Sequence, residues 1–263
     1  MKKSILIIAL TLIAKIVFAQ AKNPYLKLAG EIKKNTDIIS GYNYSETPDL
    51  NIDSICLVTA KKSVKLLTNN NWSESALKKI GLHLSLDSKD ANAIRVFNFG
   101  YDCGGTRRVI THPIIQWKNK AGKTFAYNFS SKINCRFNEV YKLKSSNRDL
   151  YLLVGQESGD GSCYQSVAYV IEIKGDFLIL DQPFFADLPF INLCNLEYDF
   201  NPKTQEFRGL LEHASSRRDL TSLMPGVKTE KLKALIAEGY FSEPSQFELK
   251  FDGQKFVKVK NEN

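Results

Sequence analysis

The residues of this sequence best suited to chemistry are its cysteines, three of which stand in turns between apolar segments. These are Cys103, Cys135 and Cys163, and the last follows directly after the Gly-rich segment ESGDGS. A thiol becomes a nucleophile when a base generates the thiolate and donors stabilise the oxyanion. The backbone N–H groups of ESGDGS are candidate donors, and Asp160 within it could orient a histidine. Cys163 with Asp160 is therefore one hypothesis for a catalytic site.

The three histidines do not fit this hypothesis well. His83 alternates with leucines and is expected to face solvent, whereas His112 lies in the middle of an extended segment and His213 in an irregular one. The nucleophile of a thiol hydrolase usually begins a helix, which lowers its pKa. The VAYVIEI segment after Cys163 is instead typical of a strand. We therefore expect no catalytic residue, with Cys163 and Asp160 as the alternative.

Disulfide bonding is a simpler use of the same cysteines. An exported chain folds in an oxidising compartment, where each bridge across a large loop adds about 2–4 kcal/mol of stability. Five cysteines allow at most two bridges and leave one thiol over, for which Cys56 in a predicted helix is the natural choice. The first pairing expected is Cys135 with Cys163. The alternative is that all are reduced and buried as small hydrophobes. The candidates for bridging are Cys103, Cys135, Cys163 and Cys194.

Other kinds of site lack a sequence signature. No HxxxH, HExxH or paired CxxC pattern occurs, so we expect no metal site. The glycines of YDCGGT precede an extended segment instead of a helix, so they form no nucleotide cradle and we expect no cofactor. The carboxylates are scattered, whereas a glycosidase needs two that face each other across a cleft. A carboxylate pair remains part of the hydrolase alternative.

The first 19 residues have the features of a secretory signal. Lys2 and Lys3 precede an apolar segment that ends in small residues, which predicts cleavage between Ala19 and Gln20. The apolar segment is shorter than a membrane span of about 20 residues and is interrupted by Lys15. The alternative is an N-terminal membrane anchor. We expect a secreted or periplasmic protein with no transmembrane segment in the mature chain.

The composition excludes several classes of protein. Hydrophobic residues make up 43% and aromatic residues 11% of the 263 residues, which is too apolar for a disordered chain. Five cysteines in this length are too few for a disulfide-rich miniprotein. The 36 Lys and Arg residues exceed the 28 Asp and Glu residues, yet no basic run of five or more occurs. Nucleic acid is therefore not an expected partner.

The hydrophobic pattern changes near residue 80. Before that point apolar residues recur at helical spacing, with a first helix beginning at Pro24 and ending before Gly41. A second helix is expected over about 53–68, capped by Asp53 or Ser54, and a short third one opens at Ser73 and Glu74. After this point the period becomes two, as in half-buried strands. The expected strands are 82–86, 94–102, 107–117, 123–130, 136–144, 150–156, 164–173 and 176–180.

Two further hairpins and one helix are expected toward the C-terminus. The hairpins surround NPKT and Asp252-Gly253, the latter a type I′ signal, and the helix covers about 228–238. The PFFADLPF segment before them is loop-like. The fold class is thus mainly β (α+β). It is an antiparallel meander of seven or more strands, as a sandwich, a barrel or an irregular propeller-like array, with two or three N-terminal helices. The expected organisation is a signal peptide (1–19), a helical segment (20–80) and an antiparallel β domain (81–263).

Alternate turns of a meander lie at the same end of the sheet. The turns at 103–106, 131–135 and 157–163 should therefore share one end. This end carries three cysteines, and the charged residues beside them are Asp102, Asp160, Arg107 and Arg136. Loops on a rigid sheet commonly carry function, so this end is the expected working face.

One resemblance adds to this interpretation. The segments HLSLDSKDANAIRVFNFGYDCGGTRR, IIQWKNKAGK and YLLVGQESGDGSCYQSVAYVIEIKGD resemble parts of uncharacterised secreted proteins of Bacteroidota. The resemblance implies a secreted β-rich fold and no particular activity. The expected function is a secreted or periplasmic, non-catalytic β-rich module that binds an unknown protein partner or small ligand. The alternative is a hydrolase with Cys163 or a carboxylate pair at the cysteine-bearing end.

The signal sequence gives a first testable prediction. When the full chain is exported from a bacterial host, its intact mass should correspond to a chain that begins at Gln20. A mass that still includes residues 1–19 would instead favour the membrane anchor. Replacing Ala19 with a bulky residue serves as the control, because it should block cleavage at this position.

Overall fold

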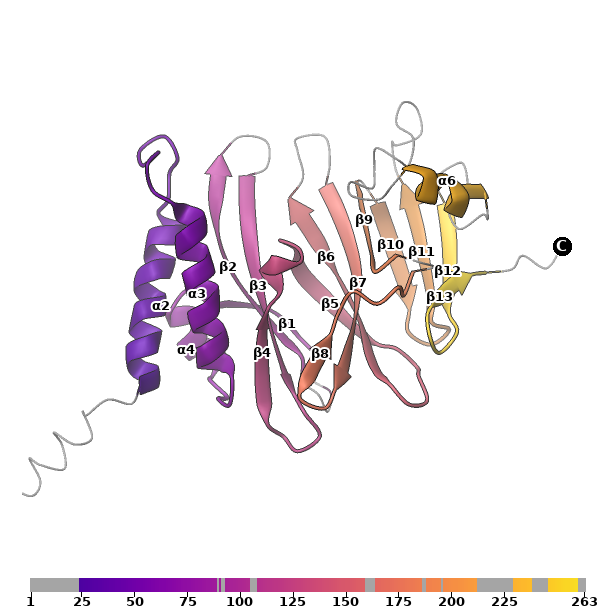
Figure 1. Ribbon diagram of the computed structural model, residues 1–263, viewed down its shortest axis with the longest axis horizontal. Coiled ribbons are helices and arrows are strands. Elements are labelled where there is room, and N and C mark those ends of the chain that lie inside the picture. Colours follow the sequence, from indigo (N-terminus) through magenta and orange to yellow (C-terminus); the bar gives the residue numbers. More distant parts are fainter. Residues whose placement is uncertain are drawn as a thin grey trace, which may run out of the picture.

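Three antiparallel sheets, each formed by strands that follow one another in the sequence, make up most of the molecule (Figure 1). The structure is a computed structural model and describes residues 24–88, 90, 93–104, 108–158, 164–185, 188–194, 196–211, 229–237 and 246–259. The chain is mainly β, with antiparallel sheets preceded by helices, as the sequence predicts. The sheets do not close into a barrel.

The N-terminal helices begin where local capping chemistry places them. Helix α2 starts at Pro24, where the missing N–H of proline has no cost. The carboxamide of Asn51 accepts a hydrogen bond from the Ser54 N–H and caps α3, so the predicted cap at Asp53 or Ser54 was wrong by two or three residues. The Ser73 hydroxyl caps α4 as expected. The bounds are α2 (Pro24–Ser40), α3 (Ile52–Leu67) and α4 (Glu74–Lys79).

The three sheets take their strands in chain order, as a meander does. The first sheet contains β1 (His83–Asp87), β2 (Arg95–Gly104), β3 (Arg108–Lys118) and β4 (Thr124–Asn128), followed by the 3-10 turn η1 (Phe129–Ser131). The second contains β5 (Arg136–Lys142), β6 (Asp149–Ser158), β7 (Tyr164–Lys174), β8 (Phe177–Ile179) and β9 (Phe190–Cys194). The third contains β10 (Leu196–Asn201), β11 (Glu206–Leu211), β12 (Gln246–Phe251) and β13 (Phe256–Lys258), with α6 (Thr229–Ala237) between β11 and β12.

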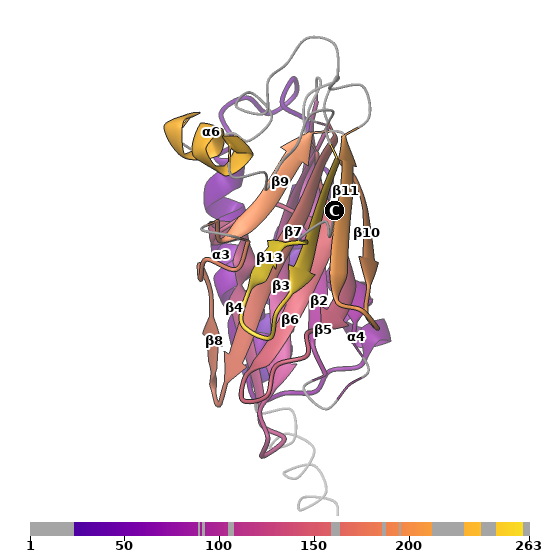
Figure 2. The ribbon, with the colours of Figure 1, turned by 90° about the vertical axis from the view of Figure 1, so that its right-hand side faces the viewer.

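Apolar faces bury one another in a stack of four layers, helices first and the third sheet last (Figure 1). Along β2, Phe97 and Phe99 face the helices, whereas Val96, the residue before Phe97, faces the second sheet. Because side chains alternate between the two faces of a strand, β2 contributes apolar side chains to the cores on both sides of the first sheet. The strands of the three sheets run in similar directions, as in aligned sheet packing (Figure 2).

Two features of the second and third sheets differ from the sequence-based expectation. The loop-like segment at 183–190 leads directly into β9, which pairs with β7 at Tyr169 and Phe190. Strand β8 pairs with β7 further along, so two short strands share one edge of β7. The loop between β12 and β13 is also longer than the two-residue type I′ turn, because Phe251 pairs with Phe256. The Asp252 carboxylate accepts hydrogen bonds from two backbone N–H groups inside this loop.

The stack predicts which apolar side chains carry the stability of the third sheet. Phe207 is fully buried, and its ring contacts those of Phe185, Tyr198, Phe247 and Phe256. Replacing Phe207 with Ala should lower the free energy of unfolding by about 3–5 kcal/mol in urea titrations.

The matched control is the same substitution at Phe177, which is 71% exposed. It should change the free energy of unfolding by no more than about 0.5 kcal/mol. Equal effects at the two positions would contradict the layered core described above.

Candidate functional site

The strand registers place the strand ends beside the three predicted turns at one end of the molecule. Strand β2 ends and β3 begins at the end where β6 stops and β7 starts (Figure 1). Strand β5 also begins there, because Arg136 pairs with Gln156 near the end of β6. Consecutive strands are neighbours from β1 to β4 and from β5 to β8, as the grouping of these turns requires.

The cysteines at this end do not form one cluster among the described residues. Cys103 lies half-buried near the end of β2. Cys135 is completely buried in the core between the first and second sheets. Cys163 and Asp160 lie outside the described residues, and of Cys194 the structure describes only the backbone at the end of β9.

The predicted disulfide at Cys135 is not formed in the structure. Cys135 and Cys56 carry free thiols, and Cys103 is likewise a thiol. The physical reason is the position of Cys135, whose side chain fills space in an apolar core as a small hydrophobe. Cys56 lies on helix α3 and is buried in the core between the helices and the first sheet, as expected for the thiol left over.

The buried thiols are protonated at neutral pH. Burial, helped by the Asp53 carboxylate, raises the pKa of Cys56 to about 12. Burial and the Glu157 carboxylate raise the pKa of Cys135 well above its ordinary value. Because the thiolate is the reactive form, neither residue is suited to nucleophilic catalysis.

The histidines divide between solvent and core. His83 is exposed at the start of β1, as expected. His112 stacks on the Phe99 ring with centroids 5.1 Å apart, and burial lowers the pKa of its imidazole. It lies toward the helices, where it contacts the rings of Phe99 and Tyr101. His213 lies outside the described residues.

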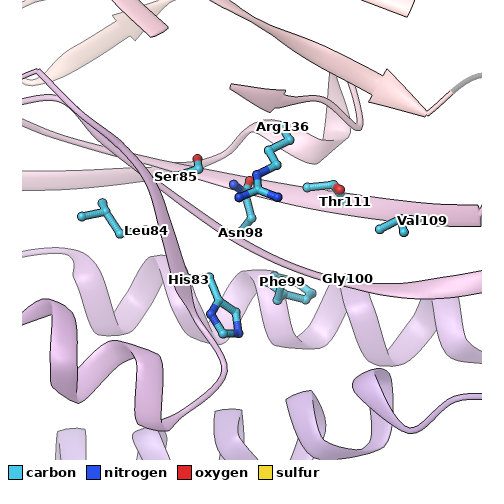
Figure 3. Close-up of a pocket in the computed structure, with 9 residues that line it drawn as sticks. All are labelled: His83, Leu84, Ser85, Asn98, Phe99, Gly100, Val109, Thr111 and Arg136. Atoms are coloured by element: carbon cyan, nitrogen blue, oxygen red, sulfur yellow. The ribbon is translucent and has the colours of Figure 1, made fainter. Parts of the chain in front are cut away.

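A groove of about 400 Å³ opens beside this end of the first sheet. Its floor is formed by β1, β2 and β3, and Arg136 reaches it from the start of β5 in the second sheet (Figure 3). The volume is in the range of small-molecule sites. The residues that line it are His83, Leu84, Ser85, Asn98, Phe99, Gly100, Val109, Thr111 and Arg136.

The groove exists because β1 is much shorter than β2. The pairing of β1 with β2 starts at His83 opposite Asn98, so β1 does not cover β2 beyond that point. Gly100, the next residue on the same face, pairs with Thr111 and adds no side chain to the floor. A Cβ atom at Gly100 would approach the Ile110 carbonyl oxygen to 2.1 Å, so the backbone packing itself requires glycine here.

Asn98 is the unusual residue of this groove. Its side chain is 7% exposed, and neither its Oδ1 nor its Nδ2 atom has a hydrogen-bond partner. Buried polar groups are nearly always paired, because an unpaired one costs about 1–3 kcal/mol. Figure 3 shows the Asn98 amide and the Arg136 guanidinium directed toward one another across the groove.

Arg136 supplies the positive charge of the groove. Its side chain is exposed, and it makes no ion pair or hydrogen bond within the part of the chain that the structure describes. None of the nine lining residues is an aspartate or glutamate. The groove therefore presents hydrogen-bond donors and one fixed positive charge toward the space between the two sheets.

A second groove, of about 260 Å³, lies on β10, β11 and β12 of the third sheet. Its one cation, Arg208, is already paired with Glu206 at 3.6 Å and with Glu248 at 3.2 Å. Glu197 and Asp199 also line it. Because its one cation is already paired, this groove offers less to an anion than the groove beside Arg136.

The sequence pointed to Arg136 as a neighbour of the turns but missed Asn98 and Thr111. One available signal was the NF pair within VFNFG, where a polar residue occupies a position of the face that buries Val96. Such a break in apolar alternation marks either a buried hydrogen bond or a site.

No protein family model, curated protein or solved structure matches the chain. None of the described helices is both long enough and apolar enough to cross a membrane.

The thiol environments give a prediction for native alkylation. In the folded protein at mildly alkaline pH, Cys56 and Cys135 should react with iodoacetamide roughly 100-fold more slowly than in concentrated guanidinium chloride, because both are buried and protonated. Peptide mass spectrometry would measure each site separately.

Cys103 provides the internal control, since it is half-buried and should react faster than the other two. Fast native labelling of Cys135 would contradict its placement in the core. Detection of Cys135 in a disulfide-linked peptide would restore the original pairing hypothesis.

Proposed function

We propose that this chain is an exported, non-catalytic binding module that holds a small ligand in the groove beside Arg136. The observation that carries the proposal is the buried Asn98 amide, which lines a groove of suitable size and lacks any partner. A ligand that fills the groove would provide the missing hydrogen bonds.

The groove has the architecture of a binding site built on a rigid support. Asn98 and Thr111 stand on adjacent strands of one sheet, and both faces of this sheet are packed against other layers. The two described thiols with raised pKa values do not favour a thiol enzyme. Binding without chemistry therefore accounts for these residues with the fewest assumptions.

Ligand-induced thermal stabilisation tests the proposal. A set of small metabolites of different charge and polarity should include compounds that raise the melting temperature of the mature chain, because a ligand that binds only the folded state stabilises it. Replacing Val109, which is 45% exposed and lines the groove, with Trp should abolish this stabilisation.

The matched control is Leu210→Trp, at a position that is 39% exposed and lines the second groove. This variant should respond to the same compounds as the unmodified chain. Loss of response in Leu210→Trp but not in Val109→Trp would move the site to the third sheet and overturn the proposal.

A further inference from the structure

We infer that the ligand of this groove carries a carboxylate group, which the Arg136 guanidinium and the Asn98 amide hold together. The inference rests on the proposed function and specifies the chemistry of the ligand. It is drawn from the groups that face the groove and from the hydrogen bonds they lack.

The polar groups of the groove favour an acceptor. Arg136 can only donate, and the Asn98 Nδ2 atom adds a donor with no partner. The Thr111 hydroxyl is a further donor, and the lining residues include no carboxylate that would repel an anion. A carboxylate accepts several hydrogen bonds at once and matches this arrangement.

Burial makes Asn98 the selective part of the site. Asn98 is 7% exposed, and its Nδ2 donor has no acceptor within the described part of the protein. A hydrogen bond from Nδ2 to a charged oxygen is also stronger than one to a neutral acceptor. An anion that accepts a hydrogen bond from Nδ2 therefore removes the part of this energetic penalty that belongs to the donor.

Arg136 determines the geometry of binding. A guanidinium presents parallel N–H donors that fit the two oxygens of a carboxylate. Arg136 is exposed and has no competing carboxylate partner among the described residues, in contrast to Arg208 with its two glutamates. The parallel N–H donors of its guanidinium are consequently available to an external anion.

The groove favours a carboxylate with an apolar body over a phosphate. Arg136 is the one arginine or lysine among the lining residues, which matches the single charge of a carboxylate better than the higher charge of a phosphate. Val109 also lines the groove and is 45% exposed, whereas the Phe99 side chain faces the helices. The Val109 side chain suits an apolar group next to the carboxylate.

Calorimetric titration with matched probes tests the inference. The probes are a panel of aliphatic and aromatic monocarboxylates, the primary amide of each acid, and inorganic phosphate. At least one acid should bind about tenfold more tightly than its amide and than phosphate. The Arg136→Gln variant should lose at least about tenfold in affinity for the acid and little for the amide.

Asn98→Leu separates a binding role from a structural one. Leucine has a similar volume and removes the unpaired amide, so this variant should melt at a higher temperature while binding the acid more weakly. A stabilised variant that keeps full affinity would remove Asn98 from the site and overturn the inference. Arg208→Gln is the matched arginine control and should bind like the unmodified chain.

The outcomes distinguish the inference from the function it rests on. If groove ligands from the metabolite set are neutral or cationic, or if phosphate or an amide binds as tightly as the acids, the carboxylate inference fails and the binding function stands. If no metabolite and no probe binds in a manner sensitive to Val109→Trp, both fail.

Discussion

The burial of both faces of the first two sheets is the constraint on which the rest of the structure depends. A sheet covered on one side only would leave Val96 or its neighbours Phe97 and Phe99 in water, so each layer requires the next. The stack can end only where a layer has a polar outer surface. Helices α2 and α3 terminate it on one side. On the other side, Glu206, Arg208, Glu248 and Lys250 form ion pairs across the third sheet.

The groove is a local exception to this rule, and the energetic cost of its unpaired amide indicates a functional role. Along most of their length the first and second sheets exclude water through apolar contacts, but β1 does not cover β2 beyond Asn98. At that position the chain has an amide where an apolar residue would have completed the core without an unsatisfied group. Natural sequences tend to break the rules of core packing at functional positions. Asn98, which faces Arg136, is a break of this kind in the packing of the core.

Much of the secondary structure follows from local patterns, whereas the relation between layers does not. Pro24, Ser73 and the change of period after residue 80 predict the helices and the start of the meander because capping and alternation act over a few residues. Strand β9 was missed because Pro183 and Pro189, which precede it, favoured a loop, and its pairing with β7 leaves no local signal. The groove was missed for a similar reason, since Asn98 and Arg136 are brought together only by sheet stacking. Sequence patterns predicted which end of the molecule carries the turns, but not that Asn98 and Arg136 lie together there.

The order of strands has a consequence for how the chain reaches this structure. Within each sheet almost every strand pairs with its neighbour in sequence, so most backbone pairing closes short loops. Folding of such a topology needs little loss of chain entropy before contacts form, and it is faster than in folds with distant pairings. A single sheet nevertheless exposes apolar side chains until the adjoining sheet is in place. The slow event is therefore expected to be the docking of preformed hairpins, and the exposed intermediates at that stage are where aggregation would begin.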